Sequence, residues 1–213
     1  MSSEPQGSRL HEVVGHWLPR MMVAGLAHGD IMRLIEETGS WPNWCATFSF
    51  DGPGQGEGRR RHHLRADWGP VLAAVTAALR NAGHLDGPVG VMGMAFGGHL
   101  ALQGAAAVPG IAAVASMNGF FDFGAFWDDL PEVYRANMGF ALGGANLAET
   151  AGRARAFSLD GVALPDCPIL VIHGGRDRIF PVGDARRVAE AAGKRAEWVE
   201  YPDGNHVCNN IAY

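Results

Sequence analysis

The sequence is short of cysteine, of positive charge and of long apolar runs. Only three cysteines occur among 213 residues (Cys45, Cys167 and Cys208), and an odd count without disulfide-like spacing indicates free thiols in a reducing compartment. The net charge of −5 gives no bulk attraction to nucleic acid. No apolar run approaches the roughly 18 residues of a membrane span, and no apolar signal-peptide core follows the polar N-terminus. We therefore expect a cytoplasmic protein with neither a nucleic-acid nor a membrane partner.

Two further patterns are missing. No set of His, Cys and Asp residues has the spacing of metal ligands, so no metal is predicted. The glycine-rich run 51–56 lacks the Gly-Lys-Ser/Thr of a phosphate loop, and Asp51 would repel phosphate, so no cofactor is predicted. The basic run 59–63, with Arg65, has two interpretations, a phosphate-binding patch or a solvated loop before a helix, and we prefer the second.

What the sequence does have is thirty glycines and an alternation of short apolar runs with helical stretches. The runs are apolar throughout, which is typical of parallel strands covered on both faces. We predict an α/β fold, with a mostly parallel sheet and helices on both faces, over residues 46–213, and a lid-like excursion over 117–160. The predicted strands are 46–50, 89–93, 111–116, 168–173 and 196–201, and the predicted helices are 68–82, 100–108 and 185–192.

The first part of the chain has a different pattern. Val13, Trp17 and Met21 recur at helical spacing within residues 10–44, and Asp30 is placed to cap a second helix. We therefore assign residues 1–45 to a partial helical cap.

One strand–turn–helix stretch has the frame of a nucleophile elbow, Gly-x-Ser-x-Gly, at residues 93–97. In such an elbow a strained central residue stands alone at the top of the sheet, between glycines that avoid a clash with the neighbouring strand and helix. The central residue here is Ala95, which has no hydroxyl.

The two partners of a nucleophile follow in the expected order, acid and then histidine. Asp177 comes after the strand 168–173, and His206 comes after the strand 196–201. The carboxyl ends of parallel strands share one edge of a sheet, where ligands bind. An Asp there would fix the tautomer of His206, which would deprotonate a nucleophile.

Together these segments resemble the α/β-hydrolase superfamily. Within it they are similar to the branch of 2,6-dihydroxypseudooxynicotine hydrolase and of fungal hydrolases that shorten polyketide pigments, where a helical cap precedes the hydrolase domain. The resemblance implies a cofactor-free Ser-His-Asp hydrolase that acts on an ester or on a carbon–carbon bond next to a carbonyl. It also implies an oxyanion donor in the Phe96 N–H. The segments are 51–57, 93–98, 173–177 and 204–208.

Three departures from this family pattern stand out. Ala95 replaces the nucleophile, so we expect an inactivated variant or a natural pseudo-enzyme. The earlier strand and donor loop that should precede the strand 46–50 are not found, because the cap-like segment ending at Trp44 runs almost directly into that strand, so we expect an incomplete sheet and a single oxyanion donor. The chain also ends at Tyr213, seven residues after His206, which favours segments missing from a longer protein. The alternative is a non-hydrolytic binding protein, lyase or cyclase that uses His206 and Asp177.

The substrate is predicted only by class. Several aromatic residues follow the strand 111–116 and suit a small-molecule substrate that is aromatic or a polyketide. Ordinary packing of a lid explains these residues equally well. A homodimer stays open. The aromatic residues are Phe120, Phe121, Phe123, Phe126 and Trp127.

Overall fold

The computed structural model describes residues 22–24 and 48–211, and the account below concerns these residues alone. Among their helices, none is both long enough and apolar enough to cross a bilayer. The elements are β1 (Met22–Ala24), β2 (Ser49–Phe50), η2 (Gly56–Arg60), α3 (Gly69–Asn81), β3 (Val89–Met94), α4 (Phe96–Ala107), β4 (Ile111–Met117), η3 (Phe123–Asp129), α5 (Glu132–Leu142), α6 (Leu147–Ala154), β5 (Ile169–Gly174), α7 (Val182–Ala192), η4 (Gly193–Arg195), β6 (Ala196–Tyr201) and η5 (His206–Cys208).

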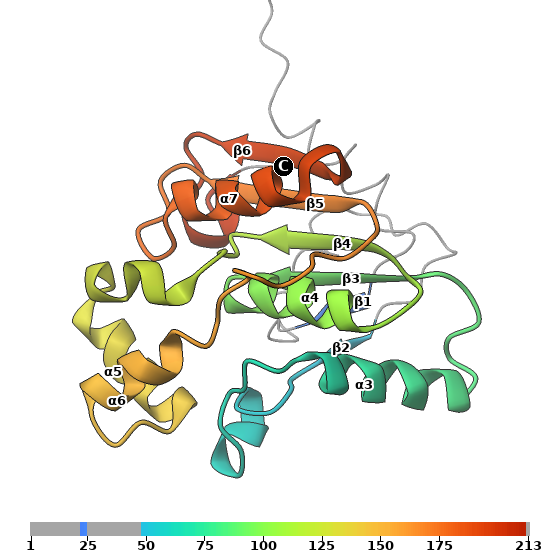
Figure 1. Ribbon diagram of the computed structural model, residues 1–213, viewed down its shortest axis with the longest axis horizontal. Helices are drawn as coiled ribbons and strands as arrows, with labels where there is room; N and C mark the ends of the chain where they lie inside the picture. The colour runs from blue at the N-terminus through green and yellow to red at the C-terminus, as the bar shows by residue number, and fades with distance from the viewer. Residues whose placement is uncertain (1–21, 25–47, 212–213) are drawn as a thin grey trace, which may run out of the picture.

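The strands form one parallel sheet of six, in the order β2-β1-β3-β4-β5-β6 (Figure 1). Each strand from β2 to β6 overlaps a predicted one, and α3, α4 and α7 overlap the three predicted helices. The predicted α/β fold with a parallel sheet is therefore confirmed. These short apolar runs are recognisable because both faces of a parallel strand are buried.

Successive strand residues point to opposite faces, so the sheet carries two separate cores. On one face, Val91 and Val171 pack with residues of α3, α4 and α7, such as Leu102. On the other face, Met92 and Leu170 belong to a second buried cluster. The three described helices that cover the sheet thus share the first face.

Strand β1 corrects the interpretation of the N-terminal segment. Met22–Ala24 lies between β2 and β3 in the sheet. A cap helix was predicted for these residues, and no strand earlier than 46–50 was expected. The apolar run is too short for periodicity to separate a buried strand from one turn of helix. The rest of the predicted cap, residues 1–21 and 25–45, lies outside the described residues, and the domain division stays a prediction.

The segment after β4, which was predicted to be a lid-like excursion, contains η3, α5 and α6, which we call the lid. Figure 1 shows these helices on the side to which the arrowheads of β4 and β6 point, the carboxyl edge of the sheet. Capping explains two of their starts, because Asp122 accepts a hydrogen bond from Gly124 N–H and Asn146 accepts one from Glu149 N–H. The buried carboxylate of Asp184 on α7 anchors the lid by accepting from Phe121 N–H at 2.7 Å.

Candidate active site

Ala95 occupies the turn between β3 and α4 in a conformation that few residues adopt. Its φ is 51° and its ψ −125°, at the N-cap of α4. Its N–H donates to the carbonyl oxygen of Met117 at 2.9 Å, which ties the turn to the end of β4. A strained, exactingly held residue between a parallel strand and a helix is the geometry of a nucleophile elbow.

Two glycines make this turn possible. A Cβ on Gly93 would collide with the carbonyl oxygen of Gly97. A Cβ on Gly98 would lie 2.6 Å from Ser116 Oγ and 3.0 Å from Gly119 Cα. Both glycines therefore allow β3, α4 and β4 to approach closely. Gly93 belongs to the predicted frame 93–97, and Gly98 follows it.

The structure brings Asp177 and His206 together. Oδ2 of Asp177 lies 2.8 Å from Nδ1 of His206, with the Asp177 side chain fully buried and that of His206 23% exposed. Each follows a strand, β5 and β6 respectively, at the same edge as Ala95. When Nδ1 carries the proton and donates it to this carboxylate, the lone pair lies on Nε2, as a general base requires.

The carboxylate of Asp177 is held in its charged form. Burial raises the pKa of Asp177. Hydrogen bonds from His206, Asn118 and the Ile179 N–H, together with the His206 charge, lower it by more, so the pKa lies below its usual range. Burial lowers the pKa of the neighbouring His173, whose Nε2 lies 3.9 Å from Asp177 Oδ2. Asp177 is thus a fixed negative charge beside His206.

The N–H of Phe96 is free of helical partners because Phe96 is the first residue of α4. Its predicted role as an oxyanion donor stays a prediction. A second donor would come from a loop after an earlier strand, and β1 is such a strand, next to β3. The residues after Ala24 lie outside the described part, so the prediction of a single donor stays a prediction.

The aromatic residues predicted to bind the substrate fall into two groups. Phe120 and two residues of η3, Phe126 and Trp127, are at most 5% exposed and pack with other lid residues in a cluster that Ala95 and Phe96 also contact. Phe121 instead lies in the core between the sheet and its helices, with Arg187 4.2 Å above its ring. Phe121 thus lies apart from the cluster that Ala95 contacts, and its predicted role in substrate binding stays a prediction. Substrate binding by the other three stays a prediction.

Two residues at the site were missed from the sequence. The ring of Phe180, fully buried, stands edge-on to His206 with centroids 5.1 Å apart. The side chain of Asn118 donates to Asp177 Oδ2 at 2.7 Å. Asn118 follows β4 directly, and a polar residue at the carboxyl end of a buried strand is the signal that could have revealed it.

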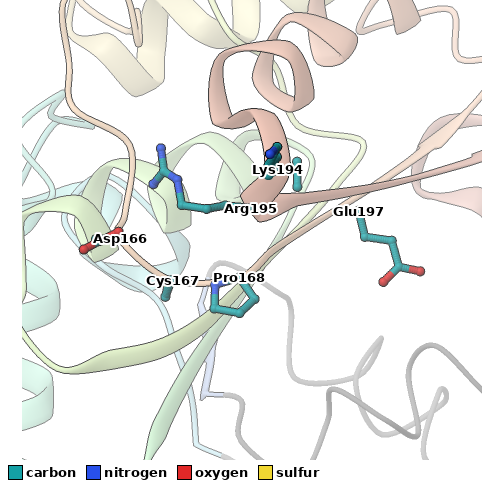
Figure 2. Close-up of a pocket in the computed structure, with 7 residues that line it drawn as sticks. Asp166, Cys167, Pro168, Lys194, Arg195 and Glu197 are labelled. Atoms are coloured by element: carbon teal, nitrogen blue, oxygen red, sulfur yellow. The ribbon is translucent and has the colours of Figure 1, made fainter.

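Figure 2 shows a hollow at the opposite edge of the sheet, where β5 and β6 begin. Arg195 there donates to the carbonyl oxygens of Leu164 and Pro165, which holds the loop before β5. The other charged residues that line the hollow are one base, Lys194, and two acids, Asp166 and Glu197. Within the described residues, no three His, Cys, Asp or Glu side chains are grouped as metal ligands would be. The candidate site is therefore the edge that carries Ala95.

Comparison with known proteins agrees with this geometry. Residues 61–210, which include Ala95, Asp177 and His206, match the model of the dienelactone hydrolase family. The chain belongs to this family, within the α/β-hydrolase superfold.

Two curated relatives of this family member are hydrolases by name. The 2,6-dihydropseudooxynicotine hydrolase of Paenarthrobacter nicotinovorans is 29% identical over 170 residues, 78% of this chain and 46% of the relative. Hydrolase LUC6 of Fusarium sp is 42% identical over 91 residues, 39% of this chain and 22% of the relative.

A solved structure gives the same relationship. The crystal structure of the 2,6-dihydroxy-pseudo-oxynicotine hydrolase superposes with a TM-score of 0.78 at 27% identity, covering 90% of this chain and 55% of that one. The chain thus spans about half the length of the first relatives that it matches.

Proposed function

We propose that this chain carries the frame of a Ser-His-Asp hydrolase in which Ala95 occupies the nucleophile position, and that its hydrolytic turnover is strongly reduced. The single observation that carries the proposal is the elbow conformation of Ala95 at the same sheet edge as the Asp177–His206 pair. The reaction of the frame is hydrolysis of an ester or of a carbon–carbon bond next to a carbonyl.

In this mechanism a hydroxyl at position 95 would attack the substrate carbonyl. His206 Nε2 would take the hydroxyl proton and later return it to the leaving group, while Asp177 holds the Nδ1–H. The negative oxygen of the tetrahedral intermediate would accept from Phe96 N–H. With a methyl group at position 95 no acyl-enzyme forms, which costs about a million-fold in turnover in a serine-type enzyme.

The name of one relative supports a small molecule as the substrate. That relative acts, by its name, on a pseudooxynicotine derivative. We infer that the substrate here is a small molecule that is aromatic or a polyketide, bound between the edge of the sheet and the aromatic residues under the lid.

A second candidate function has one observation in its favour. The Asp177–His206 hydrogen bond of 2.8 Å is present although position 95 carries no hydroxyl. Such a pair can transfer a proton without a covalent step, as in an elimination or a cyclisation.

The test compares the chain itself with Ala95→Ser on aryl esters and on vinylogous ketones. A gain of about a million-fold in kcat is expected if two oxyanion donors are present. The gain falls to about a thousand- to ten-thousand-fold if Phe96 N–H acts alone, because a missing donor costs about a hundred- to a thousand-fold.

Ala95→Gly is the matched control, because it relieves the positive φ without adding a hydroxyl and should stay inactive. Equal hydrolysis by the Ala95 and Ser variants would overturn the proposal. Turnover by the Ala95 chain that disappears in His206→Ala would favour the second candidate.

A further inference from the structure

We propose that Asn118 is the positioning residue of the Asp177–His206 pair, and that it locks together the three loops that form the site. The inference rests on the proposed function, because a positioning role has meaning only where the pair performs chemistry. Asn118 is part of neither the elbow nor the predicted triad, and this positioning role is new.

Asn118 is placed between strands at the heart of the carboxyl edge. It follows β4 and is fully buried. Its N–H donates to the carbonyl oxygen of Ile172 on β5 at 2.7 Å. Its φ of 47° lies in the left-handed region, which Asn adopts more readily than most residues. The side chain is therefore delivered to a fixed point beside the β5 loop.

At that point Asn118 completes the bonding of the Asp177 carboxylate. Oδ1 of Asp177 accepts from the N–H groups of Ile179 and Phe180 at 2.8 and 3.0 Å. Oδ2 accepts from Asn118 Nδ2 at 2.7 Å and from His206 Nδ1 at 2.8 Å. Each oxygen thus has two partners, which uses its two lone pairs. A carboxylate bound on all sides cannot rotate away from His206.

The Asn118 amide is itself oriented by the loop that carries His206. Nδ2 lies 3.4 Å from the carbonyl oxygen of Asn205, and Oδ1 accepts from Cys208 Sγ at 3.4 Å. A flipped amide would set its oxygen against the carboxylate and the carbonyl, so only one orientation is bonded. Residues on both sides of His206 therefore contact one side chain, which also contacts Asp177.

The non-glycine residues with a strained backbone lie close to His206 in the sequence or in the loops that carry Ala95 and Asn118. Within the described residues, the non-glycine positions with positive φ are Ala95, Asn118, Val207 and Cys208. All four lie in the loops after β3, β4 and β6. Strained conformations persist where the surroundings over-determine them, and they cluster at active sites. The side chain of Asn118 joins two of these segments, the one after β4 and the one after β6.

Two variants test the proposal. Asn118→Asp keeps the shape and the tolerance for positive φ but replaces the donor with a second carboxylate. Asn118→Gly suits the backbone and removes both side-chain bonds. Gln103→Leu is the control, because it removes an amide that accepts from Trp68 N–H at 2.8 Å on the far part of α4. Circular dichroism would establish that each variant folds.

The first readout needs no turnover and uses the chain with Ala95. A carbon-13 NMR titration follows the Asp177 carboxyl, which faces His206, His173, Cys208 and Tyr134 as titratable neighbours. We expect the pKa of Asp177 to rise in Asn118→Gly. In Asn118→Asp the two carboxyls should titrate as a coupled pair, one of them well above the usual range. The NMR signal of the His206 Nδ1–H should weaken in both variants, and Gln103→Leu should change neither.

The second readout is kcat in the Ala95→Ser background. Loss of a hydrogen bond to a charged group should lower kcat by about tenfold to a hundredfold and leave KM within about twofold. An unchanged Asp177 titration, or an unchanged kcat in a folded variant, would overturn the positioning role. If Ala95→Ser proves inactive while both NMR changes occur, the proposed function fails and the arrangement around Asn118 stands.

Discussion

The ring of His99 stacks on the ring of Phe120, with centroids 4.5 Å apart and an interplanar angle of 15°. His99 lies on α4 one turn after Ala95, and its side chain is fully buried. Burial lowers the pKa of His99 to about 4, although a contact with the Phe120 carbonyl oxygen acts in the opposite direction. The neutral ring thus joins the elbow helix to the chain that follows β4.

This burial predicts a pH dependence of stability. Between pH 6.5 and about 4 the unfolded state binds a proton at His99 and the folded state does not, so the free energy of unfolding falls with the pH. A shift of this size amounts to about 3 kcal/mol across the window. In His99→Gln the decrease measured by urea unfolding should be smaller by about that amount.

Two other buried groups affect how the stability depends on pH in this experiment. The lowered pKa of His173 contributes with the same sign, so the slope should flatten in His99→Gln without vanishing. The contribution of Asp177 is lost only at lower pH, because its folded pKa lies below 3.8. The exposed His84 provides the control, since His84→Gln should keep the full decrease. Equal slopes in the two variants would show that His99 is protonated in the fold.

The second prediction concerns Asp177→Asn in the Ala95→Ser background. An amide at this position can donate to His206 Nδ1 and favour the wrong tautomer. We expect kcat to fall by about ten-thousand-fold with little change in KM. Asp203→Asn, on an exposed acid paired with Arg176 at the same edge, should alter kcat by less than about twofold. A similar loss in both variants would point to a general effect of charge instead.

The third prediction concerns the packing of the elbow. The Cβ introduced by Gly98→Ala would lie 2.6 Å from Ser116 Oγ and 3.0 Å from Gly119 Cα, and backbone cannot yield easily. We expect the free energy of unfolding to fall by about 1–3 kcal/mol. Gly152→Ala on α6, where a Cβ meets nothing within 4 Å, should raise it by about 0.5–1 kcal/mol. Urea unfolding measures both, and an unaffected Gly98→Ala would mean that α4 and β4 pack loosely here.

The sequence by itself determined the alternation of strands and helices over 49–117 and 169–201, because apolar runs, turn glycines and helix periods are local signals. It predicted only a lid-like excursion over 117–160 and not the helices α5 and α6. It also placed Ala95, Asp177 and His206 at one edge, since each follows a strand and the strands are parallel. Local signals failed at Met22–Ala24, where three apolar residues became a strand only through pairing with β2 and β3.

Tertiary structure decided the contacts that join distant parts of the chain. It placed Phe120 and Phe121 in different clusters, because the side on which each ring packs depends on the elements that surround the segment. It brought Asn118 to Asp177 across 59 residues and to Cys208 across 90. No periodicity spans such separations, and a hydrogen bond there depends on three loops packed at one edge of the sheet.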